Sequence, residues 1–135
     1  MNKVVEELKK IKVFYIATID GEKPKVRPFS SVAEFEGHIY ICTGKQKETY
    51  KQLSLNPHIE LCGMYDGGNW VRVAADVVED DRTEAQEAVL SDPTGPSQLY
   101  KANDGRFVVF KLINVKAYKY NFYSAPEEIK EIWVN

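Results

Sequence analysis

Cysteine and histidine are scarce in this 135-residue chain, which has only Cys42, Cys62, His38 and His58 of these types. A zinc site would need closely spaced ligand pairs, and the sequence contains none. We therefore expect two buried free thiols and no metal site. The histidines are isolated from each other, so a Ser-His-Asp catalytic arrangement is disfavoured as well.

Long apolar runs and an excess of positive charge are also absent. No apolar stretch is long enough to span a membrane, and the N-terminus lacks the basic region and apolar run of a signal peptide. We therefore expect a cytoplasmic protein with no membrane partner. The formal net charge is −2, whereas a general nucleic-acid binder would carry a strongly basic face, so no nucleic-acid partner is expected.

The composition itself is that of an ordinary globular domain, with 44% hydrophobic and 28% charged residues. A chain of this length can bury a sizeable core without disulfides or metals. No internal repeat, low-complexity tract or interdomain linker divides the sequence. We therefore predict a single domain over residues 1–135.

Most of the predicted elements are short strands joined by tight turns. The turns at Asp20-Gly21, Glu36-Gly37 and Asp66-Gly67 favour hairpins. A further tight turn at Asn114 would separate the last two strands. The predicted strands cover residues 14–19, about 23–34, 38–42, 59–65, 70–78, 107–113 and 115–120.

Three helices are predicted between and before these strands. The first is amphipathic, because apolar residues recur at helical spacing from Val4 to Ile11. The second runs from Lys45 to Leu55, and the third follows a cap at Asp80 or Asp81. Hairpin connections imply antiparallel pairing, and a sheet of six or seven strands tends to close. The expected fold is a mainly β, antiparallel β-barrel with peripheral helices, and no glycine fingerprint supports a Rossmann fold.

Two segments together predict an anion-binding site. Residues 25–32 form a strand that carries Arg27, and residues 40–53 form a strand that ends at Thr43 and enters a helix past two lysines. Helix N-terminal amides, a hydroxyl and cations suit a phosphate monoester. Each feature alone has a simpler explanation, a solvated lysine face or an exposed strand arginine. Taken together, they favour a phosphorylated cofactor.

The order of these segments resembles that of the pyridoxamine 5′-phosphate oxidase-like family over residues 3 to 120. The resemblance is carried by the Arg27-Pro28 strand, the Thr-Gly-Lys-Gln-Lys turn from Thr43, and Asn56-Pro57 before the next strand. It also includes the Trp-Val-Arg-Val strand from Trp70. It implies the FMN-binding split barrel, FMN as cofactor, and a homodimer with two flavins at its interface.

The resemblance also implies a set of cofactor-binding residues. Arg27 and Lys47 match the residues that hold the FMN phosphate, and the backbone of residues 28–30 matches the segment along the polar edge of the flavin. Trp70 and Arg72 match positions near the dimer interface, although Trp70 could instead be simply a core or interface aromatic. The full set is Arg27, Pro28, Phe29, Ser30, Thr43, Lys45, Lys47, Trp70 and Arg72.

The function implied by the resemblance is a flavin-dependent oxidoreductase of unknown substrate, with the redox chemistry at the flavin and no identifiable catalytic acid or base. The biosynthetic oxidases have an Arg-X-His near the C-terminus that contacts substrate, and this chain lacks it. We therefore do not expect it to make pyridoxal phosphate. The alternatives are a non-catalytic flavin-binding or redox-sensing protein, and a relative that uses a deazaflavin or haem.

Overall fold

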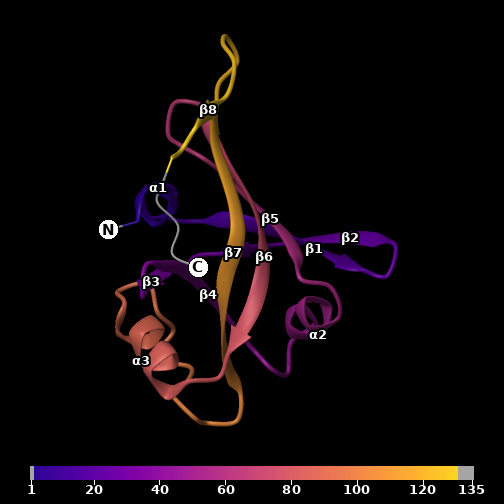
Figure 1. The fold of residues 1–135 in the computed structure, drawn as a ribbon, viewed down its shortest axis with the longest axis vertical. Helices are drawn as coiled ribbons and strands as arrows, with labels where there is room; N and C mark the ends of the chain where they lie inside the picture. The colour runs from indigo at the N-terminus through magenta and orange to yellow at the C-terminus, as the bar shows by residue number, and fades with distance from the viewer. Residues whose placement is uncertain (1, 131–135) are drawn as a thin grey trace.

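An eight-stranded antiparallel sheet forms the centre of the computed structural model, which describes residues 2–130 (Figure 1). The hydrogen-bonded strand order is β2-β1-β5-β6-β7-β4-β3, with β8 paired to β7. The end strands β2 and β3 are not paired with each other in the described part of the chain, so the sheet is open there. The strands are β1 (Phe14–Asp20), β2 (Lys23–Phe29), β3 (Ala33–Phe35), β4 (His38–Gly44), β5 (His58–Met64), β6 (Trp70–Asp80), β7 (Phe107–Tyr120) and β8 (Glu127–Glu128).

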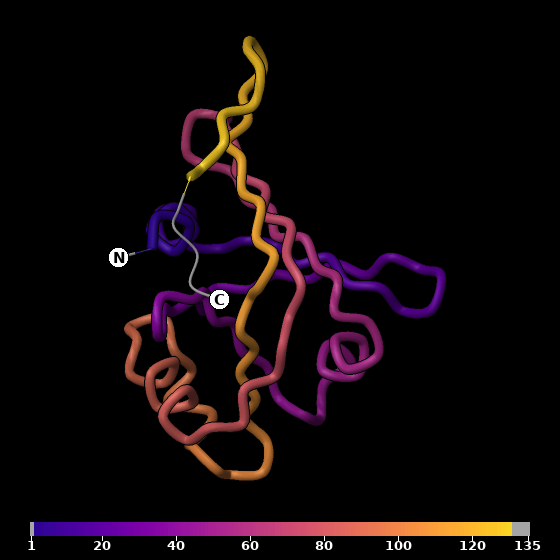
Figure 2. Tube along the Cα trace, in the orientation of Figure 1, coloured from indigo at the N-terminus to yellow at the C-terminus, as the bar shows by residue number. Residues whose placement is uncertain are grey.

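Helices α1 (Lys3–Ile11), α2 (Glu48–Leu55) and α3 (Thr83–Ser91) lie around this sheet, which confirms the predicted mainly β architecture with peripheral helices. Figure 1 shows α2 beside the β1–β2 hairpin and α3 near β3. The tube trace shows β6 and β7 running side by side over their length (Figure 2). None of the helices in residues 2–130 is long and apolar enough to cross a membrane.

Two apolar clusters form the core, one on each side of the β4–β7 region. The larger one gathers inward-facing residues of the sheet and of α1, among them Leu8, Phe14 and Leu61. The smaller one lies under α3 and includes Tyr40 and Val89. Because side chains alternate along a strand, this burial pattern defines an inner and an outer face for each strand. That assignment decides which candidate site residues can meet.

The strand predicted over residues 23–34 is in fact two strands. β2 ends at Phe29, and β3 begins only at Ala33. Between them, the Val32 amide donates to Thr94 Oγ1 over 3.1 Å, and that hydroxyl donates to the Val32 carbonyl over 3.0 Å. Because these backbone groups bond to Thr94, the chain can leave one end of the sheet and join the other. The predicted site residue Ser30 therefore lies in a connection.

The prediction of a tight turn at Asn114 was wrong, because β7 continues through this position as one long strand. Asn114 has a φ of 53°, and the pairing register shifts between Ala74 and Asp76 on the neighbouring β6. The Asn114 side-chain amide donates to Asp76 Oδ2 over 2.9 Å. An asparagine that tolerates positive φ favours a turn and a β-bulge alike, and here it forms an irregularity within a strand.

The starts of two helices also differ from the prediction. α2 begins at Glu48, because the residues before it form a turn in which the Lys47 amide donates to the Gly44 carbonyl over 3.0 Å. α3 begins after its N-cap residue Arg82, so neither Asp80 nor Asp81 is the predicted cap. The Asp80 carboxylate instead accepts from the Arg82 amide over 3.1 Å.

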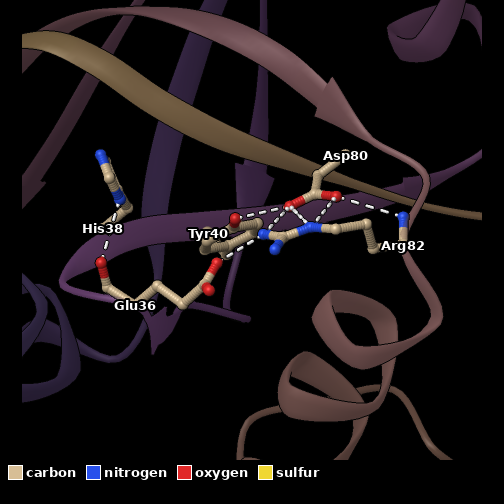
Figure 3. Close-up of polar contacts among 5 residues, drawn as sticks. All are labelled: Glu36, His38, Tyr40, Asp80 and Arg82. Carbon is tan, nitrogen blue, oxygen red and sulfur yellow. Dashed lines mark hydrogen bonds and ion pairs between the residues drawn. The ribbon is translucent and has the colours of Figure 1, made fainter. Parts of the chain in front are cut away.

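Asp80 and Arg82 belong to a polar clasp that joins the β3–β4 turn to the end of β6 (Figure 3). Arg82 donates to Glu36 Oε1 over 2.5 Å and to Asp80 Oδ2 over 2.9 Å. The buried Tyr40 hydroxyl donates to the same Asp80 oxygen over 2.7 Å. The pKa of Asp80 is well below its usual range, chiefly because of its hydrogen bonds with Arg82. The Arg82 guanidinium is already bonded to two carboxylates, so we assign the clasp a structural role.

A second polar cluster fixes α1 to the sheet through Glu7. Its carboxylate lies 2.8 Å from each of the donors Lys10 Nζ, Lys119 Nζ and Tyr65 Oη. Burial alone would raise the pKa of Glu7, but these three donors outweigh it and lower the pKa to about 2. The charged form of Glu7 therefore stabilises the folded protein.

Glu7 is expected to make stability depend on acidic pH. A folded pKa below the ordinary value of 4.5 gives stabilisation that is complete above that value and lost as the pH falls toward 2. Because Lys10 and Lys119 reach the surface, screening should reduce the contribution to about 1–2 kcal/mol. Thermal unfolding of Glu7→Gln should show this loss at pH 7 and much less near pH 3. The exposed neighbour variant Glu6→Gln serves as the control, and equal losses at both pH values would contradict this role.

Candidate functional site

Arg27 lies on the inner face of β2, opposite Ile16 of β1. Its Nη1 donates to Thr18 Oγ1 over 2.7 Å and lies 3.4 Å from the Ile16 carbonyl oxygen. Its Nη2 donates to Gln52 Oε1 over 2.6 Å. Burial lowers the pKa of the half-buried guanidinium, and none of the carboxylates in residues 2–130 forms an ion pair with it. Arg27 is therefore a partly desolvated cation whose hydrogen-bond partners within residues 2–130 are neutral.

Two of these neutral groups were not predicted from the sequence. Thr18 is 2% exposed and comes from β1, whereas Gln52 is 6% exposed and comes from α2. The Thr18 hydroxyl donates to Gln52 Oε1 over 2.5 Å, which closes a three-residue network with Arg27. A weak signal for Thr18 was present, because it occupies one of the alternating positions of β1 that face inward. Gln52 resembles any other polar residue of an amphipathic helix.

The lysines of the β4–α2 turn lie at the start of the same helix. Lys47 occupies the N-cap position of α2, and its side chain makes no capping hydrogen bond to the helix amides. Lys45 and Lys47 are exposed, and neither forms an ion pair within the described residues. Burial raises the pKa of the Cys42 thiol, and the nearby Lys47 charge lowers it to a smaller extent. A helix N-terminus without a side-chain cap from its N-cap residue, beside lysines that form no ion pair in the described residues, favours an anion.

The remaining predicted residues of this region are distributed on both sides of the sheet. Phe29 is on the inner face and packs edge-on against Phe14, with ring centroids 6.4 Å apart. Thr43 is 6% exposed, near the end of β4. Pro28 lies opposite Tyr15 and is exposed on the outer face. Only part of the predicted set therefore shares the inner face with Arg27.

Trp70 and Arg72 lie on the outer face of β6, away from Arg27. Trp70 stacks on Tyr120 with ring centroids 5.6 Å apart and an interplanar angle of 9°. Arg72 donates to Glu60 Oε2 over 2.7 Å, and its guanidinium lies 5.4 Å from the centre of the Tyr120 ring. Because Arg72 is paired with Cys62, which is paired in turn with the exposed Tyr15, these side chains share the outer face. One protomer does not bring them together with Arg27.

A cleft of about 210 Å³ lies next to the Arg27 network, between the β1–β2 turn and α2. Gln52 belongs both to its wall and to the network, and Lys51 and Glu48 also line it. A cleft of about 830 Å³ lies elsewhere, between α1 and the C-terminal strand β8, and is lined mainly by charged side chains. Among residues 2–130, no group of three or more histidine, cysteine or acidic side chains could hold a metal ion.

Comparison with known proteins gives consistent matches over most of the chain. A family model described as Pyridoxamine 5′-phosphate oxidase matches residues 1–119. The crystal structure of a nimc/nima family protein from Clostridium acetobutylicum has a TM-score of 0.88 and 36% identity, covering 93% of this chain and 88% of that chain. A search of the curated proteins finds no match.

More distant solved structures share the fold. General Stress Protein 26 from Bacillus anthracis has a TM-score of 0.69 and 14% identity, covering 95% of this chain and 98% of that chain. A heme binding protein from Mycobacterium smegmatis has a TM-score of 0.70 and 18% identity, covering 93% of this chain and 57% of that chain. At these identities the likeness shows the fold alone.

Proposed function

This chain belongs to the pyridoxamine 5′-phosphate oxidase family, and we propose that it binds FMN and acts as a flavin-dependent oxidoreductase. The observation that carries the proposal is the state of Arg27. A half-buried guanidinium with neutral acceptors, and with no ion-paired carboxylate in the described part of the chain, is a ready partner for a phosphate. Because the chain matches this family, we propose that the anion bound by Arg27 is the phosphate of a flavin.

Arg27 would hold the phosphate from β2, and Lys45 and Lys47 would hold it from the β4–α2 turn, with help from the Thr43 hydroxyl and the uncapped α2 amides. Each charge-assisted hydrogen bond would contribute about 1.5–3 kcal/mol. The segment 28–30 would run along the polar edge of the ring. When bound, FMN supplies the electron or hydride transfer, whereas the protein residues bind and orient it.

A homodimer is part of the proposal. The outer face of β1, β2 and β5 exposes large apolar side chains, including Tyr15, Val26 and Met64. Exposed apolar patches of this kind favour association. Trp70 and Arg72 lie on the same outer face, so in a dimer they would approach the cofactor site of the partner and not that of their own protomer. This arrangement accounts for their distance from Arg27.

FMN is better supported than haem by the side chains of this chain. A haem site needs an axial ligand, and histidine is a common one. The ring of His38 lies 3.2 Å from the Glu36 carbonyl oxygen, and that of His58 lies 2.6 Å from Asp76 Oδ1. Neither histidine contacts Arg27, and each is held by residues outside β2 and α2.

The absorption spectrum of the purified protein tests the proposed cofactor. We expect the paired bands of an oxidised flavin, or their perturbation on titration with FMN, and release of FMN on denaturation. Anaerobic bleaching by NADH or NADPH, with reoxidation by an acceptor, would support an oxidoreductase over a flavin carrier. A protein that gives no signal with FMN, but binds haemin or a deazaflavin, would contradict the proposal.

A further inference from the structure

We propose that Thr18 and Gln52 are positioning residues that hold Arg27 ready for an anion without neutralising its charge. The inference rests on the proposed FMN phosphate site. It adds two residues, from β1 and α2, that would not touch the ligand but would act through Arg27. It also gives a reason for a neutral amide, and not a carboxylate, at position 52.

The geometry fixes the guanidinium from two sides. Nη1 donates to Thr18 Oγ1 and Nη2 donates to Gln52 Oε1, at 2.7 and 2.6 Å. The third edge of the network, from Thr18 to Gln52, is 2.5 Å long. Because Thr18 and Gln52 are almost fully buried, their own side chains have little freedom. An arginine held in this way loses less conformational entropy on binding than a free surface arginine would.

The charge of the network is as important as its geometry. A carboxylate at position 52 would bond to Arg27 at least as strongly, but the resulting ion pair would compete with a bound phosphate. The neutral Gln52 oxygen accepts the hydrogen bond and leaves the positive charge uncompensated. Burial already disfavours the charged guanidinium, so an arriving anion would relieve this cost. The network therefore holds a cation at a place where an anion is favoured.

A purely structural role for the network makes a different prediction from a positioning role. If Gln52 only fastened α2 to the β1–β2 hairpin, then Gln52→Glu should be harmless, because a carboxylate still bonds to Arg27 and Thr18. If Gln52 keeps Arg27 available, the same change should preserve folding and weaken phosphate binding. Gln52→Glu thus separates stability from ligand affinity.

The test is fluorescence titration of Gln52→Glu with FMN and with riboflavin, which lacks the phosphate, alongside thermal unfolding. We expect FMN binding about 10- to 100-fold weaker than in the unaltered protein, riboflavin binding unchanged, and a melting temperature that is equal or higher. Ser54→Glu is the matched control, since Ser54 is exposed on the same helix and two positions further along, which places it on the opposite side from Gln52. The Ser54→Glu variant adds the same charge as Gln52→Glu and should bind FMN as tightly as the unaltered protein.

Thr18 provides a second, independent variant. Thr18→Val removes the hydroxyl that Arg27 contacts and should weaken FMN binding more than riboflavin binding, whereas Thr18→Ser should restore it. If Arg27→Ala weakens FMN binding but Gln52→Glu and Thr18→Val do not, the positioning inference is overturned while the proposed phosphate site stands. If the unaltered protein binds no FMN, both are overturned.

Discussion

Replacing Arg27 and Lys47 together by alanine is expected to abolish FMN retention and to leave the fold intact. Each of the two cations would make a charge-assisted contact worth about 1.5–3 kcal/mol with the phosphate. Losing both corresponds to roughly 3–6 kcal/mol, or about a hundredfold to ten-thousandfold weaker binding. The measurement is the flavin content of the purified double variant, followed by titration with FMN.

The surroundings of the two cations explain why the fold should survive. Lys47 is exposed, and Arg27 lies on β2 at one end of the strand order. Removing the guanidinium leaves the Thr18–Gln52 hydrogen bond in place, so α2 stays attached to the hairpin. Circular dichroism and the melting temperature should remain close to those of the unaltered protein.

The matched control for this variant removes the same charge elsewhere. Lys12→Ala with Lys23→Ala replaces two exposed lysines that form no ion pair within residues 2–130. That control should keep its flavin. Unchanged flavin content in the Arg27 and Lys47 double variant would show that the phosphate binds somewhere else.

The sequence predicted the cations of the candidate site but not the groups that hold them. Arg27 and Lys47 stand out locally, one on a strand before a proline and the other in a turn that enters a helix. Thr18 and Gln52 do not, because their roles depend on contacts between three elements that are separated along the chain. A single sequence contains the strand alternation and the helix period, but not which polar residues they bring into contact.

The fold likewise could be predicted where it depends on local patterns, and not where it depends on contacts between distant residues. Most strands and all three helices followed from local patterns of apolar residues and turns. The division of the strand over residues 23–34 did not, because it depends on a hydrogen-bonding partner, Thr94, that lies far along the chain. The asparagine at position 114 correctly indicated a backbone with positive φ, but we predicted a tight turn there and the structure has an irregularity within a strand. Both a tight turn and a β-bulge accept a positive φ.

Aspartate at both Val26 and Met64 is expected to convert a homodimer into monomers. Val26 is 67% exposed and Met64 is 59% exposed on the outer face. If this face is covered by a second copy of the chain, each new carboxylate would have to be buried without a partner, at a cost of several kcal/mol. Analytical ultracentrifugation should show the mass falling by half. Aspartate at the exposed Leu55, on α2, and at the exposed Leu99, in the connection between α3 and β7, should leave the mass unchanged.

The same experiment tests the place proposed for Trp70 and Arg72. Within one protomer they are separated from Arg27 by the sheet, so they can serve a flavin only if the partner presents them. The monomeric variant should therefore bind FMN more weakly than the dimer, although its Arg27 network is intact. A monomer that binds FMN as tightly as the dimer would restrict the cofactor site to the inner face of a single chain. An unaltered protein that is already monomeric would remove both residues from the site.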